Sequence, residues 1–135
     1  GTVSTGAIDP LPAMAEFCRA HHVWFHVDGA YGGFAAMVKT APEDIRGLSL
    51  ADSLAIDPHK WLYAPVEAGC ALVRDPEKHR AAYSYHPPYY HFGEEATNFV
   101  DYGPQNSRGF RALKVWMALS QVGRRGYKQL IADDM

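Results

Sequence analysis

Polar side chains that are capable of chemistry follow two apolar runs of the sequence. Asp28 closes the first run, and Asp57, His59 and Lys60 come at the end of the second. In open parallel sheets, ligands bind outside the carboxyl ends of the strands, which is where these side chains would lie. The pattern therefore predicts a site in which Lys60 and a carboxylate act together.

Lys60 is the candidate nucleophile, because Trp61 and Leu62 follow it and apolar surroundings favour a neutral amine. A neutral amine forms an imine with an aldehyde. The carboxylate of Asp28 could hold a proton on a ring nitrogen in the same cavity. An amine and a carboxylate placed in this way are what a pyridoxal phosphate site needs.

Each residue also has an ordinary structural interpretation, which these patterns leave open. A lysine after a strand is usually solvated, and an aspartate at a strand end usually forms a turn or a cap. His26 lies inside an apolar run and is typical of a hydrogen-bonded core histidine. A further alternative places a metal on His26, Asp28 and His59, although we expect no metal site.

Helical spacing of apolar residues predicts two helical regions. Residues 11–21 form the first, with Asp9 as its N-cap and Pro10 at its first position. Residues 110–122 form the second, and we expect Gly126 to break it before a last helical segment.

Short, nearly continuous apolar runs predict buried strands at residues 23–28, 53–57 and 69–73. Residues 83–108 are rich in tyrosine, proline and glycine and have no periodicity, which is typical of a functional loop. Helices that alternate with apolar strands predict an α/β fold with a mostly parallel sheet flanked by helices.

The composition excludes several classes of protein. Hydrophobic residues make up 47% of the 135 residues and charged residues 21%, which excludes a disordered chain. The formal net charge of −2 argues against nucleic-acid binding, and no apolar run is long enough to span a bilayer. The cysteines, Cys18 and Cys70, are too few for a disulfide framework, so we expect a cytoplasmic protein. Since the chain has no initiator Met and stops inside a predicted helix, we expect a piece of a longer protein.

Two motifs carry a family resemblance. They are His-Val-Asp-Gly-Ala-Tyr-Gly-Gly at residues 26–33 and Asp-Ser-Leu-Ala-Ile-Asp-Pro-His-Lys-Trp-Leu at residues 52–62, supported by Gly-Phe-Arg-Ala-Leu-Lys-Val-Trp at residues 109–116. Together they resemble the pyridoxal-phosphate-dependent group II amino-acid decarboxylases, which include the aromatic-L-amino-acid, tyrosine and glutamate decarboxylases. The resemblance implies that residues 1–135 are part of the large domain of a fold-type I (aspartate-aminotransferase-like) enzyme. The N-terminal segment and the C-terminal small domain of such an enzyme would lie outside these residues.

The resemblance also implies roles for single residues. Lys60 would anchor the cofactor through an imine, Asp28 would pair with its ring nitrogen, and Ala30 would lie against its ring. His59 and Asp57 resemble residues beside the phosphate, although Asp57 replaces an asparagine that some relatives have.

The remaining matches lie at the start of the chain and in the loop. Thr2 resembles a threonine of the cofactor pocket, and Arg108 corresponds to an arginine beside the site in the aromatic-substrate members. Tyr89, with Tyr90 as the alternative, falls at the position of a loop tyrosine that protonates Cα of the product. A phenylalanine there would suggest aldehyde-forming chemistry, so the tyrosine favours simple decarboxylation.

The resemblance finally implies an activity and partners. We expect decarboxylation of an L-amino acid, with aromatic substrates favoured by the loop tyrosine, to an amine and CO₂. We expect a homodimer that binds a small-molecule amino acid, has no nucleic-acid or membrane partner, and is inactive as this piece alone. The alternatives are oxidative deamination to an aldehyde or transamination on the same cofactor, and a non-enzymatic cofactor-binding or interaction module.

Overall fold

The computed structural model describes residues 1–91 and 97–135. They form two compact units: the first unit contains residues 1–74 and 111–135, and the second contains residues 75–110. Each unit is described by itself.

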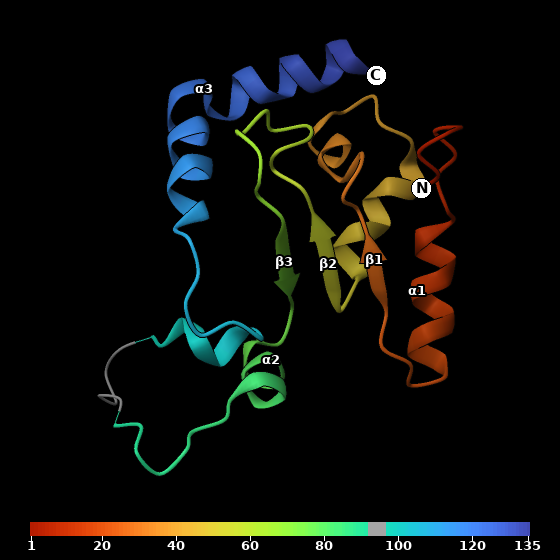
Figure 1. The fold of residues 1–135 in the computed structure, drawn as a ribbon. Coiled ribbons are helices and arrows are strands. Elements are labelled where there is room, and N and C mark those ends of the chain that lie inside the picture. The colour runs from red at the N-terminus through yellow and green to blue at the C-terminus, as the bar shows by residue number, and fades with distance from the viewer. Residues whose placement is uncertain (92–96) are drawn as a thin grey trace. The chain divides into compact units, whose positions relative to one another are not determined.

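The first unit is built on a three-stranded sheet in the order β1-β2-β3 (Figure 1). β1 (His26–Asp28) pairs in parallel with β2 (Ser53–Ile56), so that His26 lies opposite Ser53. β3 (Cys70–Val73) pairs antiparallel with β2, which makes this sheet mixed. The connection from β2 to β3 contains turns and no helix. This suits an antiparallel pair, because only parallel strands need a long crossover connection.

The strands are less buried than their apolar sequences predict. In β1, Val27 is buried while His26 and Asp28 are exposed, so one face of the strand is open. In β3, residues 70–72 are exposed, and the prediction of a strand buried on both faces is wrong. The apolar composition correctly predicted that a strand forms here, but it did not predict how many faces of the strand the described residues cover.

α1 (Leu11–Ala20) agrees with the first predicted helix, but its predicted cap is wrong. Pro10 occupies the N-cap position, and no side chain caps the helix. An aspartate cap at residue 9 would accept from the amides of residues 11 and 12, but Pro12 has no amide hydrogen and the Leu11 amide donates to the Asp9 backbone carbonyl at 2.7 Å. α1 buries Leu11 and Ala15 in a small cluster with three further residues: Phe25, Val27 and Ala51.

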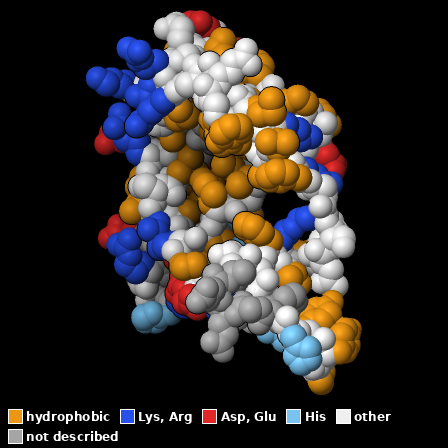
Figure 2. Space-filling model, turned by 90° about the vertical axis from the view of Figure 1, so that its left-hand side faces the viewer, with side chains coloured by type: hydrophobic (Ala, Val, Ile, Leu, Met, Phe, Trp, Pro, Cys, Tyr) orange, Lys and Arg blue, Asp and Glu red, His pale blue; other side chains and the backbone are white. Residues whose placement is uncertain are grey.

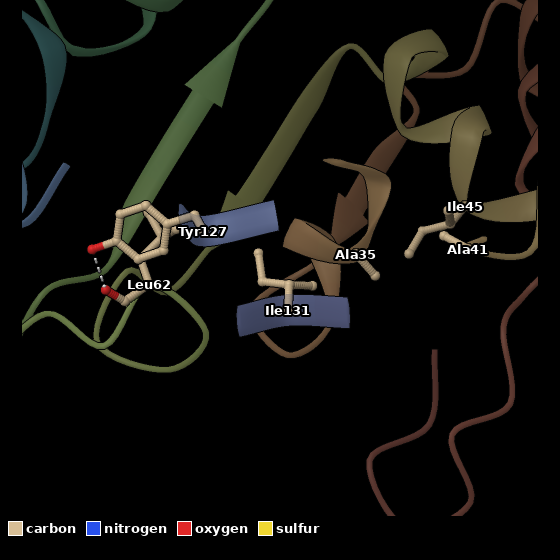
Figure 3. Packing of buried hydrophobic residues seen from close by; sticks show 6 residues of the cluster. All are labelled: Ala35, Ala41, Ile45, Leu62, Tyr127 and Ile131. Carbon is tan, nitrogen blue, oxygen red and sulfur yellow. Dashed lines mark hydrogen bonds between the residues drawn. The ribbon is translucent and has the colours of Figure 1, made fainter. Parts of the chain in front are cut away.

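Two short 3₁₀ helices, η1 (Gly33–Met37) and η2 (Glu43–Leu50), complete the core with the last part of α3 (Arg111–Asp134). Tyr127 and Ile131 of α3 are almost completely buried. Figure 3 shows both side chains in one cluster, together with Ala35, Ala41, Ile45 and Leu62.

α3 is interrupted at Gly123, where φ is 69° and ψ is 167°. Only glycine adopts this combination readily, so the helix changes direction here and the predicted break at Gly126 is wrong.

The first half of α3 exposes large apolar side chains, and Figure 2 shows a face of the molecule on which such side chains gather. The exposed apolar residues of this half are Leu113, Trp116, Met117, Leu119 and Val122. Among the described residues, no helix has both the length and the hydropathy that crossing a membrane requires.

The second unit contains α2 (Pro76–Tyr83) and the short helix η3 (Phe99–Tyr102). The carboxylate of Asp75 caps α2, because it accepts hydrogen bonds from the amides of Glu77 and Lys78, both at 3.1 Å. η3 lies within the loop predicted at residues 83–108, so this loop includes one helical turn. Residues 92–96 of the loop lie outside the described residues.

Candidate active site

Lys60 lies in a tight turn that directly follows β2. Its amide donates to the carbonyl of Asp57 at 2.9 Å, and its carbonyl accepts from the amide of Tyr63 at 3.1 Å. The amide of Ala64 reaches back to the carbonyl of Pro58 at 3.1 Å. Successive backbone hydrogen bonds therefore fix the point from which the Lys60 side chain leaves the chain.

Contacts with the hydrophobic core hold the Lys60 turn in place. The buried hydroxyl of Tyr127, on α3, donates to the carbonyl of Leu62 at 2.9 Å, the bond drawn as a dashed line in Figure 3. Burial raises the pKa of this phenol above its ordinary value. The ring of Trp61 packs edge-on against Tyr31 with ring centres 5.4 Å apart. Leu62 and Trp61 thus enter the core, and the prediction that they surround the Lys60 amine is wrong.

The nearest partner of the Lys60 ammonium is a carboxylate. Lys60 Nζ lies 2.8 Å from Asp57 Oδ2, and 37% of the lysine side chain is exposed. His59 Nε2 lies 4.0 Å from the same oxygen. The other ring nitrogen of His59, Nδ1, contacts the backbone of Ala68, at 2.7 Å from the carbonyl oxygen and 3.1 Å from the amide nitrogen. The three predicted residues of this turn are thus linked through Asp57, with the imidazole oriented by the backbone.

Asp28 is placed by the parallel pairing of β1 with β2. The amide of Gly29, the next residue, donates to the carbonyl of Ala55 at 2.8 Å and extends the pairing past the end of β1. Asp28 Oδ1 accepts from the amide of Ala30 at 3.0 Å. A short turn therefore directs the carboxylate, since an aspartate that bonds to the amide two residues ahead is held in one orientation.

Asp28, Ala30 and Lys60 line one cavity of about 300 Å³. Thr2 lines a neighbouring cavity of about 420 Å³, which Asp28 and Tyr31 also line. The fold therefore brings together the predicted amine and the predicted carboxylate, from segments more than thirty residues apart, beside a small side chain. His59 and Asp57 line neither cavity, and they join the site through the contact of Asp57 with Lys60.

Tyr89 and Arg108 belong to the second unit. The Tyr89 side chain is 74% exposed, and its ring meets Tyr90 edge-on with ring centres 4.9 Å apart. The guanidinium of Arg108 donates to the carbonyl of Phe99. Because the site cavities belong to the first unit, the roles predicted for these residues stay predictions.

His26 and Tyr31 also line the cavity that contains Lys60. His26 is exposed on the same face of β1 as Asp28, so the expectation of a core histidine is wrong. Its Nδ1 lies 2.7 Å from the hydroxyl of Ser53, which also accepts a hydrogen bond from Trp24 Nε1 at 2.8 Å. Tyr31 was missed, although its place in the His-Val-Asp-Gly-Ala-Tyr motif was a usable signal. In the described part of the chain, no three histidine, cysteine or acidic side chains are grouped closely enough to bind a metal ion.

Comparisons with known proteins identify the family. The sequence profile of the pyridoxal-dependent decarboxylase conserved domain matches residues 1–135, and the chain belongs to this family. It is 37% identical to an aromatic-L-amino-acid decarboxylase of Bacillus atrophaeus over 135 residues, which are 97% of this chain and 28% of the relative. It is 33% identical to a phenylacetaldehyde synthase of a Rosa hybrid cultivar over 97% of this chain and 27% of the relative. The crystal structure of Oryza sativa TDC with PLP and tryptamine matches 96% of this chain and 27% of that chain, with a TM-score of 0.86 and 31% identity.

These findings confirm the predicted resemblance, the predicted fold class and the predicted cofactor. The chain spans just over a quarter of the length of these relatives. The residues present fit pyridoxal phosphate, because one cavity offers an amine for the aldehyde and a carboxylate for the ring nitrogen. Ala30 also lines this cavity.

Proposed function

We propose that the whole protein decarboxylates an aromatic L-amino acid to the amine and CO₂ with pyridoxal phosphate as its cofactor. Lys60 anchors the cofactor aldehyde, and Asp28 holds the proton on the ring nitrogen. The observation that carries the proposal is that these two side chains line the same cavity. When bound, the cofactor supplies a conjugated ring that accepts the electron pair released as the carboxylate leaves.

The Lys60 turn contributes position and charge. Asp57 holds Lys60 Nζ at 2.8 Å, which restricts the flexible side chain to one side of the turn. The imidazole of His59, oriented by the Ala68 backbone, is assigned with Asp57 to the phosphate side of the cofactor. Thr2 is assigned to the cofactor pocket, in the cavity that it shares with Asp28.

Asp28 keeps the ring nitrogen protonated. Its Oδ1 accepts from the Ala30 amide, which orients the carboxylate that would pair with the ring nitrogen. A carboxylate beside the ring nitrogen favours the protonated, positively charged ring and so strengthens it as an electron acceptor. Ala30 then supports the flat ring.

The second unit contributes the last proton. Tyr89 delivers a proton to Cα after CO₂ has left, and Arg108 lies beside the substrate. The high exposure of Tyr89 supports this role, because a phenol that must approach a bound substrate cannot be packed in a core. The whole protein acts as a homodimer on a small-molecule amino acid.

Two variants of the whole protein test the proposal. Lys60→Arg removes the imine-forming amine, and we expect loss of the cofactor absorbance that an imine produces, together with loss of amine formation. Lys78→Arg is the matched control, because Lys78 also pairs with an aspartate three residues earlier, Asp75, at 3.5 Å. Asp28→Asn should retain the imine absorbance but lose most of its turnover. Normal turnover in either site variant would refute the assignment.

Aldehyde formation is the second candidate, because a phenylacetaldehyde synthase is among the relatives. That reaction consumes dioxygen and water and releases the aldehyde, CO₂, ammonia and hydrogen peroxide. Product analysis separates the two, since only decarboxylation yields the amine without consuming oxygen. Tyr89 in place of a phenylalanine supports the amine as the product.

A further inference from the structure

Asp101 is the only charged side chain that is buried among residues 1–91 and 97–135, with 2% of the residue exposed. It lies on η3, in the same unit as Tyr89 and Arg108, and no role has been assigned to it above. Burial of an ionised carboxylate is unfavourable unless donors and cations compensate for the lost water. The burial of Asp101 in this small unit therefore needs a physical explanation.

The partners of Asp101 all come from one stretch of the chain. His86 Nε2 lies 2.7 Å from Oδ1, and the hydroxyl of Ser84 donates to the same oxygen at 3.5 Å. Arg80 Nε lies 3.5 Å from Oδ2. The hydrogen bond with His86, and then the charges of His86 and Arg80, lower the pKa of Asp101 below its ordinary value, so the carboxylate stays ionised.

The contact between His86 and Asp101 lies close in sequence to Tyr89. His86 lies three residues before Tyr89, and Asp101 lies twelve residues after it. Before Asp101 in the chain, the amide of Tyr90 donates to the carbonyl of Pro87 at 2.9 Å, which forms a turn directly after His86 that contains Tyr89.

The short helix η3 is itself held in place. The amide of Asp101 donates to the carbonyl of Asn98 at 3.0 Å, and Arg108 donates to the carbonyl of Phe99. The ring of Tyr102 packs edge-on against His79 of α2, with ring centres 5.5 Å apart. These contacts hold η3 in place, and Asp101 on η3 bonds to the segment of chain that leads to Tyr89.

We propose that Asp101 is a positioning residue that holds the Tyr89 segment through His86, so that the Tyr89 phenol reaches Cα of the substrate. The inference rests on the proposed function, since it gives Asp101 a task only if Tyr89 donates the proton. Without this hold, dioxygen competes with the proton for the same carbon. The competing reaction converts the amino acid, dioxygen and water into the aldehyde, CO₂, ammonia and hydrogen peroxide.

Asp101→Asn in the whole protein tests the proposal, because the amide preserves the size of the side chain and removes its charge. We expect kcat for amine formation to fall by about tenfold or more, which corresponds to about 1.4 kcal/mol in the barrier. KM should be little changed, and the fraction of aldehyde among the products should rise. Asp75→Asn is the matched control, since Asp75 caps α2 in the same unit, and it should leave the product ratio unchanged.

A double variant separates positioning from a purely structural role. If Asp101 acts through Tyr89, then Asp101→Asn adds no further loss of amine formation to a Tyr89→Phe protein. Additive losses, or an Asp101→Asn protein with the original kcat and product ratio, would overturn the inference. His86→Gln keeps a donor but no charge, and it provides the test should Asp101→Asn fail to fold: an intermediate aldehyde fraction supports the inference, and an unchanged one contradicts it.

Failure of the inference and failure of the proposed function give different results. If Tyr89→Phe itself leaves amine formation intact, then the assignment of Tyr89 is wrong and the inference falls with it. If Tyr89→Phe abolishes amine formation while Asp101→Asn has no effect, then only the positioning role is wrong.

Discussion

Replacement of Tyr127 by phenylalanine tests how the core holds the Lys60 turn. The phenol is 1% exposed and donates to the carbonyl of Leu62 at 2.9 Å. The substitution keeps the ring in the cluster of Figure 3 and removes only the hydroxyl, which leaves a buried carbonyl without its donor. Because an unsatisfied buried polar group costs about 1–3 kcal/mol, the free energy of unfolding should fall by about this amount.

The assay is urea unfolding of the whole protein, monitored by tryptophan fluorescence. Cofactor affinity is the second measurement. Leu62 lies two residues after Lys60, so we expect cofactor binding to weaken along with stability. Tyr63→Phe is the control, since the Tyr63 hydroxyl donates to Asp134 at the surface and its loss should shift the urea midpoint far less. The reasoning is refuted if the Tyr127 variant loses no more stability than the Tyr63 variant.

The remaining predictions concern the core, the break in α3 and the buried aspartate. Ile131→Ala removes a side chain that is 0% exposed and should cost about 2–5 kcal/mol in urea unfolding; a smaller cost than that of Ile8→Ala would contradict the assigned core. Gly123→Ala introduces a side chain at φ 69°, ψ 167° and should destabilise by about 1–3 kcal/mol, as a lower thermal midpoint. Because the folded-state pKa of Asp101 lies below its ordinary value of 3.8, its contribution to stability is present above that pH and is lost as the pH falls further. Acid titration of the thermal midpoint should therefore be flatter for Asp101→Asn than for the original protein.

The sequence was a good guide wherever one physical pattern dominated. Apolar runs located the strands within a few residues, and helical spacing located α1 and the first half of α3. The rule that ligands bind at the carboxyl ends of parallel strands predicts that Asp28 and Lys60 lie close together, and the two side chains do line one cavity.

The predictions that were wrong depended on competition between neighbours. Gly123 and Gly126 are equally permissive in sequence, and it is Gly123 that adopts the non-helical conformation in α3. Asp9 has the right spacing for a cap, but Pro12 has no amide hydrogen and the Leu11 amide bonds to the Asp9 carbonyl instead. Trp61 and Leu62 follow Lys60, yet the turn sends them into the core and leaves the ammonium with Asp57.

Other features carried no local signal at all. Asp101 is one acidic residue in an aperiodic stretch, and nothing nearby in sequence indicates that it is buried by contacts with Arg80, Ser84 and His86. The antiparallel pairing of β3 likewise depends on the turns between residues 57 and 69 and not on the composition of the strand.

Borohydride reduction of the whole protein, followed by peptide mapping with mass spectrometry, tests the central claim most directly. Reduction converts an imine between the cofactor and a lysine into a stable secondary amine. The account predicts a pyridoxyl group on the peptide that contains Lys60, and its loss in Lys60→Arg but not in Lys78→Arg. A folded protein supplied with pyridoxal phosphate whose Lys60 peptide remains unmodified, or in which another lysine carries the label, would contradict the account.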